Sequence, residues 1–269
     1  MTATVASVVQ QKGGVGKTTT TICTARAAAV YHSARVLVVD FDPQGNTTST
    51  LAADEVADDQ VGVADTILPT PDAAMTEVIV PTVWNGVDLA PGGAAVQAAE
   101  RHIEASPYGR EHRLRKALEP VRGDYDLIII DNAPALGTLL VNSLTAAELA
   151  VLVVEPDQWS ADGLAMLRTT LDGVVEFSNP HLRVAGTVVN RWRHTASARE
   201  LADEITEGMA AHFAGVPVWL DRRIPLWQGI PDHVLAGRGL DEGPIKLRTL
   251  AEDVFKPISA ELLGRRVAA

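Results

Sequence analysis

The sequence predicts an α/β fold in which one parallel sheet is covered by helices on both faces. Apolar, β-rich segments alternate with helical patterns along the 269 residues, and this alternation is typical of a parallel sheet. Hydrophobic residues form 46% of the chain but aromatic residues only 4%. Ala, Val and Leu must therefore build the core, as suits strands buried on both faces. The chain has no repeat, low-complexity tract or linker, which predicts a single domain over residues 1–269.

The order of the expected elements follows from their apolar patterns. Strands are predicted at residues 4–10, 35–40, 87–93, 125–131, 150–156, 183–190 and 216–220. Helices are predicted at 17–31, 94–104, 111–119, 138–148, 161–177 and 196–213, with a last one near 244–263. The acidic, proline-containing stretch 54–75 is expected to form surface loop with a short helix.

Composition narrows the class of protein. A single cysteine, Cys23, excludes a disulfide framework and indicates a reducing compartment. The first ten residues contain no leader pattern, and no apolar run approaches the ~20 residues of a membrane span. We therefore expect a soluble, cytoplasmic protein that does not bind a membrane.

The net charge of −11 is unevenly distributed. Residues 1–180 contain 11 Lys and Arg against 23 Asp and Glu, whereas residues 181–269 contain 12 against 11. Residues 181–199 hold four arginines and no acidic residue. Charges act within a Debye length of about 10 Å, so a local basic face that binds nucleic acid is permitted despite the acidic total.

A glycine-rich segment, QKGGVGKTT at 11–19, follows the first expected strand and precedes the first expected helix. Its glycines would let backbone N–H groups turn inward and cradle phosphate, and the helix start adds a positive dipole end. This context predicts a phosphate-binding loop rather than an ordinary turn. The expected nucleotide contacts are Gly13, Gly14, Val15, Gly16, Lys17 for the β- and γ-phosphates, Thr18 for Mg²⁺ and Thr19 for the α-phosphate.

The loop departs from the standard pattern at its beginning. Gln11 occupies the position of the first glycine, and a second lysine, Lys12, follows it. The chain has only 5 lysines against 18 arginines, yet two of the lysines lie here. A compact ammonium fits a phosphate loop where a guanidinium would not. Outside this context, Lys12 would be interpreted as a solvated loop residue.

Three carboxylates end predicted strands. Asp131 follows the apolar run LIII, as expected of a Walker B residue that anchors Mg²⁺; alone, it could simply cap a turn. Asp40 and Asp42 end a neighbouring strand, and alternation would point both side chains toward the crevice beyond the strand ends. Mg²⁺ would relieve the repulsion between such close carboxylates.

Three segments, KGGVGKTT (12–19), DFDPQGN (40–46) and IIIDNAPALG (128–137), resemble those of the ParA/Soj-type partition ATPases. These belong to the deviant Walker A group, with MinD-like proteins and the nitrogenase iron protein. The resemblance implies a P-loop NTPase fold, ATP and Mg²⁺ as cofactors, and a homodimer with ATP at its interface. It further implies that Lys12 reaches the nucleotide of the second subunit, Asp42 positions the attacking water, and Asp40 supports the Mg²⁺ shell held by Asp131. Asn190 and Pro225 match positions that hold adenine.

The function implied by this resemblance is DNA partition, for a plasmid or a chromosome, by an ATPase of weak intrinsic activity. The ATP dimer would bind double-stranded DNA without sequence preference, which would place it on the nucleoid, and a ParB-like partner would stimulate hydrolysis. The loop begins about a dozen residues into the chain, so no helix-turn-helix extension is expected before it. Candidate DNA contacts are Arg191, Arg193, Arg199, Arg222 and Arg223.

Several positions depart from the family pattern. Gln10 replaces a usual asparagine, and Asn132, Ala133 and Ala135 alter the loop that senses the γ-phosphate, which bears on the rate of hydrolysis. Leu226 and its neighbours replace a stretch in which DNA-binding relatives carry arginines. An iron–sulfur role fails because only Cys23 is present, the C-terminal end lacks an amphipathic membrane anchor, and an amide-forming ligase fits DFDPQGN less well. The alternative left open is an ATP-gated positioning protein for another cargo, without DNA binding of its own.

Overall fold

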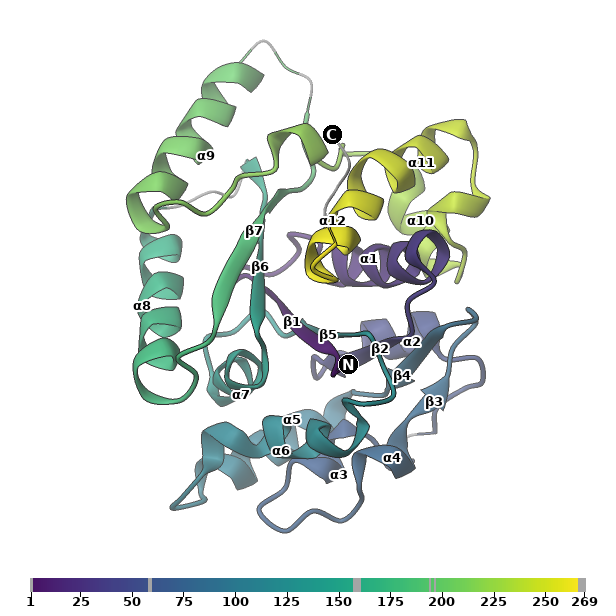
Figure 1. Ribbon diagram of the computed structural model, residues 1–269, viewed down its shortest axis with the longest axis vertical. Coiled ribbons are helices and arrows are strands. Elements are labelled where there is room, and N and C mark those ends of the chain that lie inside the picture. Colours follow the sequence, from purple (N-terminus) through teal and green to yellow (C-terminus); the bar gives the residue numbers. More distant parts are fainter. Residues whose placement is uncertain (1, 58–59, 157–160, 194, 196, 266–269) are drawn as a thin grey trace.

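The computed structural model describes residues 2–57, 60–156, 161–193, 195 and 197–265 (Figure 1). A seven-stranded sheet runs through the molecule in the order β3-β4-β2-β5-β1-β6-β7. The strands are β1 (Thr4–Val9), β2 (Val36–Phe41), β3 (Val80–Pro81), β4 (Val87–Ala90), β5 (Leu127–Asn132), β6 (Leu149–Val154) and β7 (Arg183–Val189). Every pairing is parallel except that of β3 with β4.

Alternation along the strands divides the apolar side chains between two cores. In β5, for example, Ile128 and Ile130 belong to one core, while Leu127 and Ile129 belong to the other. Strands β2, β5 and β6 are buried along their whole length, which explains why the sequence reads as continuous apolar runs. The predicted parallel sheet with helices on both faces is confirmed.

Helices of the described chain cover both faces (Figure 1). One core includes side chains of α1 (Lys17–His32), α2 (Asn46–Leu51), α10 (Gly229–Leu235), α11 (Ile245–Leu250) and α12 (Lys256–Leu262). The other includes side chains of α3 (Val63–Thr66), α4 (Met75–Val78), α5 (Ala94–Glu104), α6 (Arg113–Leu118), α7 (Thr138–Ala146), α8 (Ala161–Phe177) and α9 (Ala198–His212). Within the described ranges, no helix is both long enough and apolar enough to span a bilayer.

The strand predicted at 216–220 is wrong. Only Val218 makes a bridge, to Thr187 of β7, and a 3₁₀ turn, η4 (Leu220–Arg222), follows at once. Pro217 lacks an N–H, so it can accept a hydrogen bond from Thr187 but cannot donate one to extend the ladder.

The last predicted helix, 244–263, is also interrupted. A π-helical segment, η6 (Ala251–Phe255), joins α11 to α12. Pro257 lies in the first turn of α12. Because proline has no N–H to donate to a carbonyl one turn earlier, the regular α-helical hydrogen bonds are interrupted and the wider π-helical pattern forms before it. The elements α2, α10 and β3 were not predicted. Part of 54–75 is core rather than surface, because Val63, Ile67 and Met75 are buried.

Candidate functional site

The loop between β1 and α1 has the backbone of an anion cradle. Gly14 and Gly16 adopt φ angles of 79° and 90°, a left-handed conformation that disfavours any side chain. At Gly16 a methyl group would also collide with the side-chain amide of Asn190. Both constraints require glycine here, so the turn delivers the chain into the N-terminus of α1 with its N–H groups available to an anion.

Lys17 is a buried cation at the start of α1, with 6% of its surface exposed. Its Nζ donates to the carbonyl of Lys12 at 3.4 Å, which is a weak hydrogen bond. Burial lowers the pKa of Lys17, while the charges of Asp131 and Asp42 oppose that shift. An anionic ligand in the loop would compensate for the water contacts that the Lys17 ammonium has lost on burial.

Asp131 ends β5 directly beside this helix. Its Oδ2 accepts hydrogen bonds from the hydroxyls of Thr18, at 2.8 Å, and Thr47, at 2.7 Å. Burial raises the pKa of Asp131, and these two hydroxyls with Lys17 act against that rise. The Thr18 hydroxyl donates to Asp131, so its oxygen keeps lone pairs for a cation.

Asp40 is fully buried. It is not among the residues that line the cavity beyond the strand ends, which is described below. Its Oδ2 accepts from the N–H of Thr48 at 2.8 Å and from the Thr48 hydroxyl at 2.7 Å. Burial, and then the charge of Asp131, raise the pKa of Asp40 to about 7. The expectation that Asp40 faces the crevice together with Asp42 is therefore wrong, because Thr48 turns this carboxylate onto the start of α2.

Asp42 does reach the crevice. It lines the cavity, and its Oδ1 accepts from the N–H of Gln44 at 2.9 Å. Gln44 and Asn46 line the same wall. These two residues, and the carboxylate partners Thr47 and Thr48, were not predicted from the sequence. The signal available was the polar run QGNTT, which directly follows DFDP.

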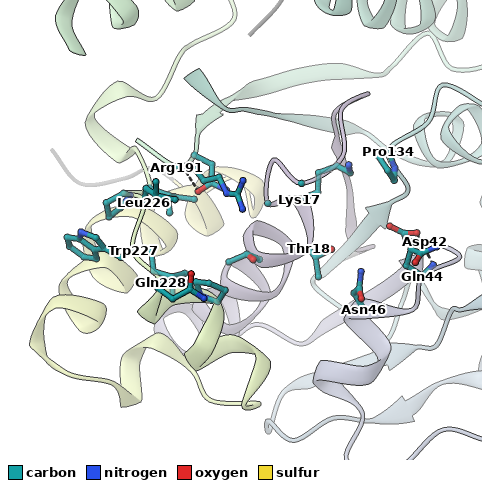
Figure 2. Close-up of a pocket in the computed structure, with 18 residues that line it drawn as sticks. Lys17, Thr18, Asp42, Gln44, Asn46, Pro134, Arg191, Leu226, Trp227 and Gln228 are labelled. Atoms are coloured by element: carbon teal, nitrogen blue, oxygen red, sulfur yellow. Dashed lines mark hydrogen bonds between the residues drawn. The ribbon is translucent and has the colours of Figure 1, made fainter. Parts of the chain in front are cut away.

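A cavity of about 400 Å³ lies beyond the carboxyl ends of the strands, the usual place for ligands in open α/β sheets. Figure 2 shows Asp42 and Gln44 at one end of it and Leu226 and Trp227 at the other. The residues that line it are Gly14, Gly16, Lys17, Thr18, Thr19, Asp42, Gln44, Asn46, Pro134, Asn190, Arg191, Ile224, Pro225, Leu226, Trp227, Gln228, Ile230 and Pro231.

Three residues of the predicted loop lie outside this lining. Val15 is buried, and its carbonyl accepts from Asn190 Nδ2 at 2.7 Å. Gly13 is exposed and lies against Pro134. Lys12 is exposed. The two lysines of the loop therefore differ, since Lys17 is buried and lines the cavity, whereas Lys12 is exposed and lies outside the lining.

Asn190 and Pro225, the two residues predicted to hold adenine, both line the cavity; their role remains a prediction. Asn190 also ties β7 to the loop, because its amide holds Val15 while its Oδ1 accepts from the N–H of Arg191 at 2.8 Å. Pro225 is bridged to Trp192 by backbone pairing. These contacts explain how the segment at 224–231 is held against the loop.

The predicted DNA arginines have different surroundings. Arg191 lines the cavity with a φ of 54° and lies 3.4 Å from the buried carboxylate of Glu155. Arg222 stacks on Trp219 at 5.7 Å, and Arg223 stacks on Trp192 at 4.9 Å. Arg193 is exposed. For Arg199 the structure describes only the backbone, in the first turn of α9.

Two departures from the family pattern have structural roles. Gln10 donates from Nε2 to the carbonyl of Val153 at 3.0 Å, joining the end of β1 to β6. Asn132 is buried and donates to Ser7 Oγ at 3.0 Å and to the Val8 carbonyl at 2.9 Å. Both residues therefore fix the strand beneath the loop.

The donor set suits Mg²⁺ better than a transition metal. Within the ranges that the structure describes, no cluster of three or more His, Cys, Asp or Glu could hold a metal ion. The oxygens available are those of Thr18 and the carboxylates, in a site with room for phosphate. Mg²⁺ typically takes one or two protein oxygens and completes its shell with water and phosphate.

Comparison with known proteins agrees with this geometry. Residues 3–184 match the family described as AAA domain. Over 184 residues, the chain is 40% identical to the sporulation initiation inhibitor protein Soj of Bacillus subtilis, covering 68% of this chain and 70% of Soj.

Solved structures share the fold. The ADP and magnesium complex of cobyrinic acid a,c-diamide synthase from Mycobacterium smegmatis has 30% identity and a TM-score of 0.74, with 88% of this chain and 91% of that chain covered. The ATP complex of a McdA variant from Cyanothece has 20% identity and a TM-score of 0.82, with 99% and 98% covered. From the family match and the identity to Soj, the chain belongs to the ParA/Soj-type P-loop ATPases.

Proposed function

We propose that this protein is an ATP-dependent switch for DNA partition, in which Mg²⁺ and ATP join two copies of the chain. The observation that carries the proposal is the contrast between the two lysines of one loop. Lys17 is buried and lines the cavity, whereas Lys12 is exposed and is not part of the lining. An exposed ammonium on the same loop is suited to contact phosphate bound in a second subunit.

The residues of the site support a division of roles. The loop N–H groups and Lys17 would bind the phosphates, and Thr18 with Asp131 would hold Mg²⁺, which neutralises phosphate charge. Asp40 would support that shell from behind, through its proximity to Asp131. Asp42 would orient the attacking water, because the Gln44 N–H occupies one of its oxygens and the other remains available.

Hydrolysis is proposed to be slow until a ParB-like partner acts on the dimer. A DNA role requires only phosphate contacts, which two subunits would double. Arg193 and Arg199 are the proposed DNA contacts, together with the exposed part of the Arg191, Arg222 and Arg223 group. Binding to the nucleoid would follow from this activity.

A second candidate function is an ATP-gated positioning protein for a cargo other than DNA. The environment of the arginines favours it, since Arg191 is paired with Glu155 and Arg222 and Arg223 are stacked on tryptophans. Leu226 and Trp227 also stand where DNA-binding relatives carry basic residues. In this case ATP would still control the joining of two subunits.

Binding to random-sequence duplex DNA, measured with ATP, ADP or no nucleotide, separates the two functions. We expect salt-sensitive binding with ATP that Asp42→Ala retains and Lys12→Ala loses. Absence of DNA binding in every state, with ATP-dependent dimers still present, would favour the second function. Absence of both would overturn the ATP switch itself.

A further inference from the structure

The end of the cavity farthest from Asp42 is lined mainly by apolar side chains, with Arg191 and Gln228 beside them. Figure 2 shows Leu226 and Trp227 there, at the opposite end from Asp42 and Gln44. The apolar lining of this end is formed by Ile224, Pro225, Leu226, Trp227, Ile230 and Pro231. A nucleotide with its phosphates in the loop would extend its base toward this wall.

Trp227 differs from the other tryptophans that the structure describes. It is 40% exposed, whereas Trp84, Trp192 and Trp219 are buried. Trp227 also lines the cavity. The exposed part of its side chain is therefore available to a ligand bound there.

The ring is also held in position. The N–H of Trp227 donates to the Pro225 carbonyl, and its own carbonyl accepts from Ile230, both within 3.1 Å. The ammonium of Lys246 lies 5.9 Å from the ring centroid. These contacts fix the residue at the start of α10 and place a cation over the ring.

We propose that Trp227 contacts the base of the bound nucleotide and gives the site a preference for purine nucleoside triphosphates. The proposal rests on the nucleotide-binding role of the loop proposed above. Aromatic side chains stack on any base, and the larger purine ring offers more surface than a pyrimidine. The contact would not by itself distinguish adenine from guanine.

Binding of Mg²⁺-ATP, Mg²⁺-UTP and Mg²⁺-tripolyphosphate by calorimetry tests the assignment. Trp227→Ala is expected to weaken ATP binding about tenfold, to reduce the preference for ATP over UTP, and to leave tripolyphosphate unchanged. Trp227→Phe is expected to restore most of the ATP affinity. Tripolyphosphate lacks a base, so it separates a base contact from general damage to the loop.

Tryptophan fluorescence gives a second readout. ATP is expected to change the emission of the wild-type protein, and Trp227→Phe should lose most of that change. Trp192→Phe is the matched control and should keep it, because Trp192 is buried against Arg223.

The outcomes separate this inference from the proposed function. Wild type that binds ATP, with Trp227→Ala equal to it in affinity, would overturn the role of Trp227 and leave the nucleotide site intact. Equal loss of ATP and tripolyphosphate affinity in Trp227→Ala would also contradict a base contact. Wild type that binds neither ATP nor tripolyphosphate would overturn the proposed function as well.

Discussion

The two ends of the cavity are built in different ways. At the phosphate end, buried charges are paired with hydroxyls, as Asp131 is with Thr18 and Thr47. At the other end, Leu226 and Trp227 are 43% and 40% exposed, while Ile224 and Ile230 are buried. The first arrangement is already ordered around charge and leaves little freedom to vary, whereas the second leaves apolar surface open to a ligand. Chemistry that transfers phosphate requires the former, and selectivity among nucleotides can reside in the latter.

The largest expected effect is at Lys17. Replacing it with Gln removes the buried ammonium that faces the phosphates, so ATP affinity should fall roughly 100-fold or more, as for loss of a charge-assisted contact in a buried site. Calorimetry measures the change. Lys116→Gln, at an exposed position of α6, is the matched control and should bind ATP as the wild type does. Unchanged affinity in the Lys17 variant would contradict the assignment of this end to phosphate.

Gly16→Ala should damage the phosphate end through the backbone. It introduces a side chain at φ 90° and against the Asn190 amide, so the free energy of unfolding should fall by about 2–4 kcal/mol. Urea denaturation measures it. Gly173→Ala in α8, where an added methyl meets nothing within 4 Å, should instead stabilise the protein by about 0.5–1 kcal/mol. Equal effects of the two substitutions would be inconsistent with a strained loop.

Thr47→Val tests the pairing of the buried carboxylate. It leaves Asp131 with one hydroxyl fewer, which should raise the pKa of Asp131 further and destabilise the protein by about 1–3 kcal/mol. Mg²⁺-dependent ATP binding should weaken about tenfold. The comparison variant is Thr50→Val, because the Thr50 hydroxyl bonds only to the Asn46 carbonyl of its own helix. A Thr47 variant that behaves like the Thr50 variant would show that the hydroxyl pair has no special role.

The buried carboxylate behind Asp131 should make stability depend on pH. The pKa of Asp40 is raised to about 7, above its value of ~3.9 in an unfolded chain. The folded state therefore binds more protons between these values, and without nucleotide its stability should fall as pH rises from about 4 to 7. Urea unfolding of wild type and Asp40→Asn at pH 5 and pH 8 measures this. The Asn variant lacks this titrating group, so its free energy of unfolding should change less between the two pH values. A larger loss in the Asn variant than in wild type would contradict the raised pKa of Asp40.

The phosphate end could be predicted from the sequence and the other end only in part. Local motifs identified Lys17, Thr18 and Asp131, because the phosphate-binding loop and the strand that ends in a carboxylate are each made of residues a few positions apart. Apolar patterns also identified the six parallel strands. The hydrogen bonds between the Asp40 carboxylate and Thr48 were not predictable. Strand alternation indicates the face of the sheet on which a side chain lies, but not its hydrogen-bond partner in the next helix.

The end of the cavity lined by residues 224–231 depends on contacts between distant segments. Trp192 pairs with Pro225, and Asn190 reaches Val15, so neither the position of Trp227 nor that of Arg191 follows from local sequence. The interrupted last helix and the single bridge at Val218 depend on individual prolines. Each proline interrupts hydrogen bonding only locally, whereas the apolar pattern around it is still that of a regular strand or helix. The pattern alone therefore did not reveal the interruption.

The most direct test of the account is the oligomeric state with ATP and Mg²⁺, measured by light scattering after size exclusion. Calorimetry on the same samples measures binding of the nucleotide. Asp42→Ala is expected to slow hydrolysis and to give a stable dimer with ATP and a monomer with ADP. In the Asp42→Ala background, Lys12→Ala should still bind ATP within a few-fold but remain a monomer. A Lys12 variant that dimerises with ATP as fully as its parent would contradict the role of the exposed lysine across the subunit boundary.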